Sequence, residues 1–323
     1  MHTCRICFNT LSSSKITVKN LAYKDTKTQS IYCYCNRCSA LNLVSTDAFV
    51  NETINFDFFG RNRLAKTSLN YKFQKIRSSF FLGNFTVFGL LLAMIFDDPY
   101  SLKNYKKYLS KESYSLLDIG CADGKFIFDI SYFNKNSKFL GIDPFINQSY
   151  TDANVTLTSN TLLLNEDKFD YITLNHVIEH LDNPEEILKS YIPYLKKDGL
   201  IIIRTPITSN PIYSIFRKSW VGFYSPYHRT IFNTKSLSYL IKKIGFQEVY
   251  STTDTTIWSI ISSIFFIMEI PFRYHLLIYL VILPIFFPII AIFHILIYFL
   301  NIKGKGDMLF LIIERDNLFE ISK

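Results

Sequence analysis

The fold is decided by the stretch Leu116-Leu117-Asp118-Ile119-Gly120-Cys121-Ala122-Asp123-Gly124. Its first four residues predict a short apolar strand, and the helically spaced segment 125–130 predicts a helix directly after the glycine-bearing turn. Glycines in such a turn let the backbone approach a ligand closely. About 20 residues further on, the segment 138–143 predicts a second strand that ends in Asp143, a carboxylate placed to accept hydrogen bonds from ribose hydroxyls. The order strand, glycine turn, helix and strand-terminal acid predicts an α/β fold.

Two later segments extend this pattern. Residues 168–181 end in Glu179-His180-Leu181, and a helix is predicted to open at Pro184. Residues 197–206 predict a turn and a buried strand. Together with the first two motifs, these segments resemble class I S-adenosylmethionine-dependent methyltransferases of the subgroup with a Glu-His-Leu signature, over residues 116–246. The resemblance implies a Rossmann-like, seven-stranded sheet with helices on both faces.

The resemblance also implies a set of cofactor-binding residues. Asp118 and Gly120 would lie against the methionine part of S-adenosylmethionine, Asp143 would hold the ribose, Phe145 would lie beside the adenine, and Asn175 would lie near the sulfonium. The remaining cofactor positions are in the loop itself: Cys121, Ala122 and Gly124. Two alternatives stay open, because Asp118 would also serve as a cap for a helix beginning near Asp123, and Phe145 would also suit a hydrophobic core.

Ala122 departs from the family pattern, which commonly has glycine there. Alanine leaves cofactor binding intact if φ at this position is negative. A nicotinamide-dinucleotide site would need Gly-x-Gly-x-x-Gly, whereas this loop offers Gly120 and Gly124 only.

Methyl transfer to a hydroxyl group requires a general base in addition to alignment of the reactants. His176 and His180 are four residues apart and are predicted to share a helix face, and His228 lies in the segment 220–229, which is predicted to form a loop over the pocket. His180 and His228 are the candidate catalytic bases. For His180 the alternative is a structural hydrogen bond within the signature.

Five of the six cysteines lie within the first 38 residues. Cys4, Cys7, Cys35 and Cys38 form two Cys-x-x-Cys pairs, a spacing typical of a zinc ribbon with one structural Zn²⁺. The alternative is a pair of disulfides, which a reducing cytoplasm disfavours. We expect the metal to organise a small N-terminal module and to take no part in chemistry.

The chain is both basic and apolar, with a net charge of +8 and 49% hydrophobic residues. This combination favours an anionic membrane surface at least as much as nucleic acid. The first residues lack the apolar core of a signal peptide, so we expect the enzyme to face the cytoplasm. Between residues 51 and 114, basic positions precede the apolar run 80–96, which is typical of either a membrane-surface helix or a helix packed on the catalytic domain. The basic positions are Arg61, Arg63, Lys66, Lys72, Lys75 and Arg77.

The segment 257–300 has only two formally charged residues, Glu269 and Arg273. It separates a predicted sixth strand at 248–252 from a predicted seventh at 308–315, which pair as neighbours in the class I fold. An insertion between paired strands crosses a membrane an even number of times or not at all. Because Pro284 and Pro288 interrupt the longer part, a re-entrant or interfacial hairpin is favoured over two full spans, and an apolar lid on the catalytic domain is the alternative.

The predicted organisation has five parts. They are a zinc ribbon (1–50), a helical connector (51–114), the methyltransferase core (115–256), a membrane-associated hairpin (257–300), and the final strand with its tail (301–323).

This layout predicts O-methylation of a glycan or lipid-linked intermediate on the cytoplasmic side of a membrane. Methylation of a quinone or isoprenoid ring is the enzymatic alternative, and a non-catalytic membrane-attached binding protein is the alternative from another class. Nucleic acid is disfavoured as a partner, because 175–178 lacks the Asn-Pro-Pro-Tyr type of tetrapeptide that base methylators use.

Overall fold

The structure is a computed structural model, and it forms two compact units. The sheet unit comprises Asn51–Asn175 and Tyr191–Ile203, and the terminal unit comprises Met1–Val50, His176–Ser190 and Arg204–Lys323. The described residues are 2–22, 27–47, 69–95, 98, 101–109, 111–164 and 168–316. The predicted basic positions Arg61, Arg63 and Lys66, and the end of the tail, lie outside the described residues.

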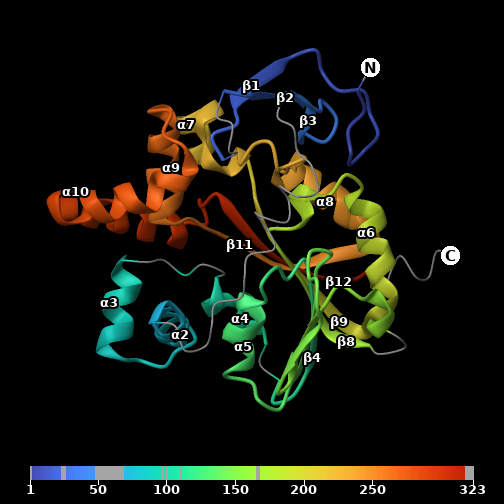
Figure 1. Cartoon of the computed structure of the whole chain (residues 1–323). Helices are drawn as coiled ribbons and strands as arrows, with labels where there is room; N and C mark the ends of the chain where they lie inside the picture. The colour runs from blue at the N-terminus through green and yellow to red at the C-terminus, as the bar shows by residue number, and fades with distance from the viewer. Residues whose placement is uncertain are drawn as a thin grey trace. The chain divides into compact units, whose positions relative to one another are not determined.

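The sheet unit is built on parallel strands. In it β4 pairs in parallel with β5 and with β8, and β5 pairs in parallel with β7 (Figure 1). The strands are β4 (Ser115–Ile119), β5 (Lys138–Ile142), β6 (Tyr150–Asp152), β7 (Val155–Thr158), β8 (Phe169–Asn175) and β9 (Leu195–Pro206). β4 and β8 are buried along almost their whole length, as expected for central parallel strands, although each carries an aspartate.

The mixed sheet has the strand order β11-β12-β9-β8-β4-β5-β7-β6. The fold class is therefore the Rossmann-like α/β class predicted from the sequence, but the number of strands is eight instead of seven. The extra strand is β6, an edge strand that pairs antiparallel with β7. Its three residues, Tyr-Thr-Asp, are too short and too polar to have been recognised as a strand.

The helices of the sheet unit follow the expected breaks in the sequence. Helix α5 begins at Lys125, directly after the glycine turn, as predicted. The apolar run 80–96 divides between two helices at Gly83, which has a φ of 94°. The helices are α2 (Leu69–Phe81), α3 (Val87–Ile95), α4 (Leu102–Tyr108) and α5 (Lys125–Ser131).

The terminal unit holds a small antiparallel sheet of order β1-β2-β3-β10. Three of its strands come from the N-terminal residues, and the fourth, β10 (Thr230–Ile231), comes from far along the chain and pairs with β3. The N-terminal strands are β1 (Lys15–Lys19), β2 (Gln29–Tyr34) and β3 (Leu41–Thr46). The segment that was predicted to be a loop, 220–229, lies beside this sheet, because Trp220 and Phe223 share a buried cluster with Tyr32 and Leu41.

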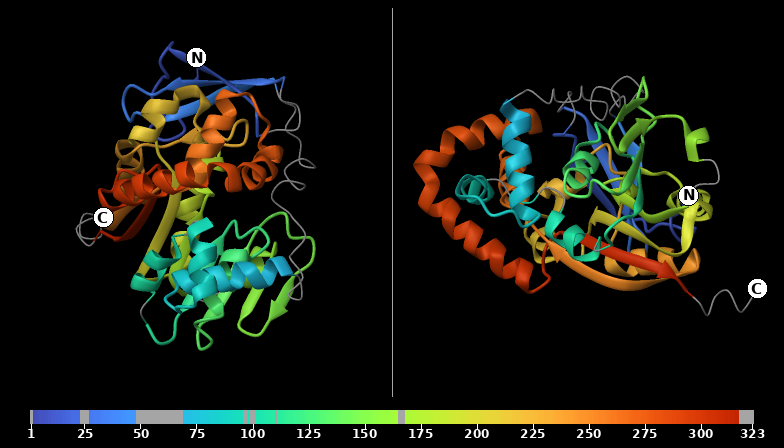
Figure 2. Two further views of the ribbon diagram at one scale, coloured as in Figure 1. Left: turned by 90° about the vertical axis from the view of Figure 1, so that its left-hand side faces the viewer. Right: turned by 90° about the horizontal axis from the view of Figure 1, so that it is seen from below.

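The predicted sixth and seventh strands are confirmed as neighbours. β11 (Phe246–Asp254) and β12 (Met308–Arg315) pair antiparallel along their length, as Figure 2 shows. Two helices, α9 (Ile257–Ile267) and α10 (His275–Ile302), form the insertion between them. Helix α10 continues through both Pro284 and Pro288. Further helices of this unit are α6 (Pro184–Tyr191), α7 (Pro211–Phe216) and α8 (Thr234–Lys243).

Within the described part of the chain, no helix combines the length and the apolar character needed to cross a membrane.

One helix prediction was wrong. His176 and His180 do not share an α-helix, because residues after β8 form a bend followed by a 3₁₀ helix, Ile178–His180. His176 has a φ of 55°, a left-handed conformation that no α-helix contains. The α-helix begins only at Pro184, as its proline predicted.

Candidate functional site

The glycine loop after β4 folds back over the end of β5. Gly120 N and Cys121 N both donate to the carbonyl oxygen of Ile142, at 2.7 and 3.2 Å. Gly120 and Gly124 have φ values of 68° and 77°, which favour glycine. A Cβ atom on Gly124 would lie 2.4 Å from the Leu157 side chain. Conformation and space therefore both require glycine at the end of this loop.

Ala122 also adopts a positive φ, 48°. The condition under which alanine would be harmless, a negative φ, is therefore not met, and the sequence-based expectation is corrected at this point. An L-residue in this region is strained by roughly 1 kcal/mol. The strain is held by a hydrogen bond, because Ala122 N donates to Asp143 Oδ2 at 2.9 Å.

Asp143 directly follows β5 and is 4% exposed. Each of its carboxylate oxygens accepts one backbone N–H, Oδ2 from Ala122 and Oδ1 from Phe145 at 2.9 Å. Burial raises the pKa of Asp143, and these two bonds act in the opposite direction. Phe145 is half-buried and does not lie in the core, so the alternative that made it a core residue is wrong.

Asp118 is 2% exposed and lies in β4. Its Oδ1 accepts the Thr173 hydroxyl at 2.6 Å and the Asn175 amide at 3.4 Å. It does not cap a helix, because α5 has Gly124 at its N-cap with no side-chain cap bond. Burial raises the pKa of Asp118 to about 7, against the effect of the hydrogen bonds from Thr173 and Asn175.

Tyr105 of α4 is a further member of this cluster that the sequence did not indicate. Its hydroxyl donates to Asn175 Oδ1 at 2.7 Å, and its ring, fully buried, packs on Phe126 with the centroids 4.6 Å apart. Asn175 therefore bridges Tyr105 and Asp118, which fixes the orientation of its amide. One tyrosine among 21, in a connector without a motif, gives no signal that would have singled it out.

The sheet unit thus brings together the predicted positions Asp118, Asn175 and Asp143 at the carboxyl ends of three neighbouring parallel strands. In open α/β sheets this edge is where ligands bind. Among the described residues, neither Asp118 nor Asp143 forms an ion pair. A ligand with an amino group and a pair of hydroxyls, as in S-adenosylmethionine, suits two buried carboxylates beside a glycine loop.

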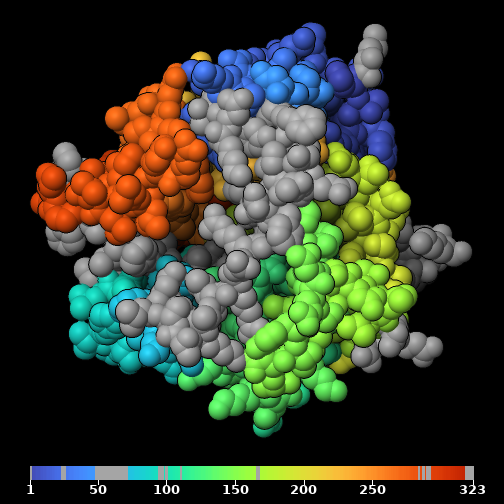
Figure 3. Space-filling model, viewed as in Figure 1, coloured from blue at the N-terminus to red at the C-terminus, as the bar shows by residue number. Residues whose placement is uncertain are grey.

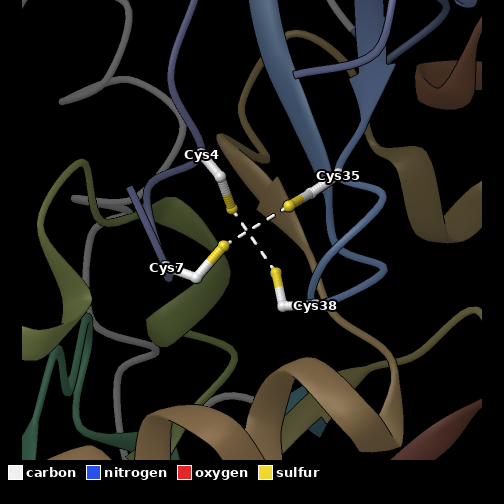
Figure 4. A group of neighbouring side chains, drawn as sticks. All are labelled: Cys4, Cys7, Cys35 and Cys38. Atoms are coloured by element: carbon white, nitrogen blue, oxygen red, sulfur yellow. Dashed lines mark hydrogen bonds between the residues drawn. The ribbon is translucent and has the colours of Figure 1, made fainter. Parts of the chain in front are cut away.

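The four predicted zinc ligands also come together. Cys4, Cys7, Cys35 and Cys38 are buried, and their Sγ atoms all lie within 4.8 Å of one another (Figure 4). The Sγ–Sγ distances are 3.5 Å for Cys4–Cys38 and 3.4 Å for Cys7–Cys35. A tetrahedral Zn²⁺ with bonds of about 2.3 Å places thiolates about 3.8 Å apart, close to these values. The cysteines are free, so the disulfide alternative is not the arrangement in this structure.

Hydrogen bonds support a thiolate at Cys4. Its Sγ accepts Ile6 N at 3.4 Å and Asn42 Nδ2 at 3.6 Å. The hydrogen bond with Cys38 is the largest influence, and it lowers the pKa of Cys4 to about 5 while raising that of Cys38. Four buried sulfurs at these distances fit a structural zinc ion, which would hold all of them as thiolates when bound.

The predicted bases lie in the terminal unit around Glu179, whose side chain is fully buried. His176 Nδ1 lies 3.3 Å and His228 Nε2 lies 3.9 Å from Glu179 Oε1. The rings of His180 and His228 are in contact, with centroids 4.7 Å apart. Glu179 is a residue that the sequence reasoning missed as an individual member of the site, although it belongs to the quoted signature.

Burial keeps the two candidate bases neutral. Desolvation lowers the pKa of His180, and it lowers that of His228 to about 3. Burial raises the pKa of Glu179, but the His176 imidazole, 3.3 Å from the carboxylate, outweighs burial and brings this pKa to about 2. A histidine with such a low pKa is a weak base near neutral pH. The catalytic role of His180 or His228 stays a prediction.

Comparisons with known proteins match a range that includes strands of both units. Residues 96–251 match the model of a family described as "Methyltransferase domain". The chain is 30% identical over 105 residues to (S)-coclaurine N-methyltransferase of Papaver somniferum, a match covering 29% of this chain and 30% of that protein. The chain thus spans less than a third of the length of this curated relative.

The comparison with solved structures found two matches of low sequence identity that illustrate its range. A coclaurine N-methyltransferase bound to N-methylheliamine and SAH has 13% identity and a TM-score of 0.42, with 80% of this chain and 86% of that chain covered. A SAM-dependent methyltransferase from Archaeoglobus fulgidus has 19% identity and a TM-score of 0.40, with 70% and 98% covered.

Replacing Ala122 with glycine should stabilise the protein. The change removes the strain of a positive φ in the folded state. The greater freedom of glycine in the unfolded chain offsets part of this gain, so we expect the free energy of unfolding to increase by about 0.5 kcal/mol. Chemical denaturation of the two proteins measures it. A loss of stability in the Ala122→Gly variant would show that the loop is not strained.

Replacing Asp118 with asparagine should stabilise the protein at high pH. Asp118 has its pKa raised from 3.8 to about 7 in the folded state, so its contribution is favourable below pH 4 and is lost as the pH rises through 7. The free-energy difference between Asp118→Asn and the parent should grow by up to about 4 kcal/mol from pH 4 to pH 8. Urea denaturation at several pH values measures this difference.

Asp170 provides a control of opposite sign. Although burial opposes it, hydrogen bonds from Lys111 and Lys196, both at 2.8 Å, hold the pKa of Asp170 well below its usual range. The Asp170→Asn variant should therefore be less stable than the parent above pH 4. A pH-independent difference for Asp118→Asn would contradict the assigned effect of burial.

Proposed function

We propose that this chain, whose residues 96–251 form a class I S-adenosylmethionine-dependent methyltransferase domain, methylates an oxygen of a glycan or lipid-linked acceptor at a membrane surface. Methyl transfer itself rests on the domain match. The acceptor and its location are supported by the apolar surface of the insertion.

The observation that carries the methyl-donor assignment is the pair of buried carboxylates, Asp118 and Asp143, beside the loop 120–124. S-adenosylmethionine supplies an activated methyl group on a sulfonium. Asp118, ionised, would pair with the amino group of its methionine part, and Asp143 would accept hydrogen bonds from the ribose hydroxyls. Asn175, held by Tyr105, would line the same end of β8. The residues present therefore fit this cofactor.

Membrane attachment is supported by α10. Within Arg273 to Lys303 no formally charged residue interrupts the helix, and many of its large apolar side chains are exposed, including Leu277 at 65% and Ile285 at 71%. Figure 3 shows side chains of α9 and α10 on the molecular surface. An apolar surface of this kind rarely faces water in a monomeric soluble protein.

The flanks of α10 indicate which membrane it would meet. Arg273 precedes the helix, and Lys303 and Lys305 follow it, all three exposed. Cations beside an apolar helix favour anionic lipid headgroups, each worth about 1 kcal/mol near the surface. We therefore infer that α10 lies in the interface of an anionic membrane. An enzyme attached in this way meets acceptors that the membrane carries, such as lipid-linked sugars, and an isoprenoid ring is the alternative acceptor.

Binding of the methyl donor should depend on both carboxylates. We expect calorimetry to show that S-adenosylmethionine binds the parent protein, and that Asp143→Asn and Asp118→Asn each weaken binding at least tenfold, because each loses a charge-assisted hydrogen bond. Asp123→Asn, on the same loop but half-exposed, is the matched control and should bind normally. A parent protein that does not bind the donor would contradict enzymatic function and favour a non-catalytic binding protein.

The acceptor class is tested with labelled methyl donor and membranes of the cells that make the protein. Label that enters lipid-extractable sugars as an alkali-stable ether would support the proposal. Label found on a quinone ring or on an amine would contradict the proposed glycan or lipid-linked oxygen acceptor and would identify the labelled group as the acceptor instead.

Attachment is measured by sedimentation with lipid vesicles. The parent protein should bind vesicles containing phosphatidylglycerol more tightly than vesicles of phosphatidylcholine alone. Leu277→Asp together with Leu280→Asp should weaken binding at least tenfold, because charge enters the apolar interface. Ile215→Asp is the matched control, since Ile215 is 73% exposed on α7 and lies outside α10. Parent protein that stays in the supernatant with both lipids would rule out this attachment.

A further inference from the structure

A second cluster of metal-ligating side chains lies in the terminal unit, apart from the four cysteines. Glu179, His180 and His228 each offer one ligand atom, and these three atoms lie within 4.8 Å of one another. His228 Nε2 is 3.9 Å from Glu179 Oε1. Glu179 is fully buried and His228 is 5% exposed, so the cluster is shielded from bulk water.

Backbone carbonyl groups fix which ring nitrogen is protonated in His180 and in His228. His228 Nδ1 lies 2.8 Å from the carbonyl oxygen of Gly222, and His180 Nδ1 lies 3.1 Å from that of Tyr227. A carbonyl oxygen only accepts hydrogen bonds, so Nδ1 carries the proton in both rings. In a neutral ring Nε2 then carries the lone pair. Metal-bound histidines are commonly arranged in this way, with one ring nitrogen on the metal and the other donating to a backbone carbonyl.

The carboxylate of Glu179 is oriented through one oxygen only. Its Oε2 accepts the Thr205 hydroxyl at 2.9 Å, whereas Oε1 accepts no hydrogen bond from the described residues. His176 Nδ1 comes within 3.3 Å of Oε1 but does not meet the geometry of a hydrogen bond. A buried carboxylate oxygen with only such a weak polar contact is incompletely stabilised, and a cation beside it would lower its free energy.

The other ring nitrogen of His176 is already hydrogen-bonded. Its Nε2 is 2.6 Å from Arg204 NH1, and Arg204 also pairs with Asp254 at 2.9 Å. Since arginine only donates, His176 Nε2 is the acceptor of that bond. His176 is therefore a neighbour of the Glu179 carboxylate that is held by Arg204, and its imidazole is not placed as a third nitrogen ligand.

We propose that Glu179 Oε1, His180 Nε2 and His228 Nε2 bind one divalent transition-metal ion, with Zn²⁺ the best match to two imidazoles and one carboxylate. Bonds of about 2.1 Å require the three atoms to lie within about 4.2 Å of one another, so small side-chain rotations close the site. Three protein ligands leave a fourth position free. His180 is the least buried of the three residues.

The experiment is a metal count on the full chain with Zn²⁺ as the probe. The protein is equilibrated with excess Zn²⁺, separated from free metal by gel filtration, and analysed by elemental mass spectrometry. We expect two ions for each parent chain, one at the cysteines and one at Glu179. Glu179→Gln and His228→Gln should each lose one ion, since each removes a ligand. Metal binding is measured without methyl donor or acceptor, so its result is independent of methyl transfer.

His176→Gln is the matched control. It alters a side chain that lies equally close to Glu179 Oε1 but is not a proposed ligand, so both ions should remain. The ion bound by the cysteines reports that the terminal unit is still folded in each variant. With Co²⁺ in place of Zn²⁺, the Glu179→Gln variant should lose the visible bands of the ion at the histidines while keeping both the visible and the sulfur-to-metal charge-transfer absorption of the cysteine site.

Either of two results would overturn the proposal. One is a parent chain that retains only the metal ion of the cysteines and shows only its charge-transfer spectrum. The other is a Glu179→Gln variant that keeps both ions, and this variant also decides the matter if His228→Gln does not fold.

Discussion

Burial of negatively charged groups is the constraint on which both candidate sites depend. Asp118 and Glu179 are almost completely buried, and each is held through one oxygen by a threonine hydroxyl, from Thr173 and Thr205 respectively. These neutral donors, with the Asn175 amide as a second one at Asp118, offset only part of the desolvation of a carboxylate, so a cationic partner would stabilise each site further. Both sites therefore favour ligands that carry positive charge.

The two ends of β8 differ in how their buried polar groups are paired. At its beginning, Asp170 accepts hydrogen bonds from Lys111, Lys196 and Ser115, so both oxygens have protein partners. At its end, Asn175 joins Asp118 to Tyr105 with no cation among the described residues. The amino end of the parallel strands is closed by ion pairs, whereas the carboxyl end keeps polar groups for a ligand, as is general in open α/β sheets.

The features that the sequence predicted are those encoded in short contiguous segments. The loop 116–124, the strand-terminal Asp143 and the two Cys-x-x-Cys pairs each combine residue type with spacing, and the structure places them as expected. The pairing of β11 with β12 was predictable for another reason, because β12 has a clear apolar run and the family resemblance implies that the two strands are neighbours.

What the sequence did not predict depends on backbone conformation or on distant pairing. The left-handed conformation of Ala122 is set by the hydrogen bond to Asp143, which is 21 residues away. The bend at His176 breaks a helical spacing that looked continuous from His176 to His180, because Arg204 holds both its backbone N–H and its ring. Tyr105 reaches Asn175 across 70 residues. None of these relations leaves a periodic pattern in the sequence.

The four cysteines have a wider structural role than holding their own module. Asn42 donates to Cys4 Sγ and pairs with Thr230 between β3 and β10. The neighbouring Arg229 donates its N–H to the Glu179 carbonyl at 2.8 Å, and the Tyr32 hydroxyl donates to the His228 carbonyl at 2.9 Å. These contacts connect the cysteine module with the segment that carries His228, so a structural ion at the cysteines would stabilise the histidine cluster indirectly although it contacts none of its side chains. The cysteine module and the segment that carries His228 therefore belong to one packed framework, in which β3 pairs with β10 and Tyr32 contacts His228.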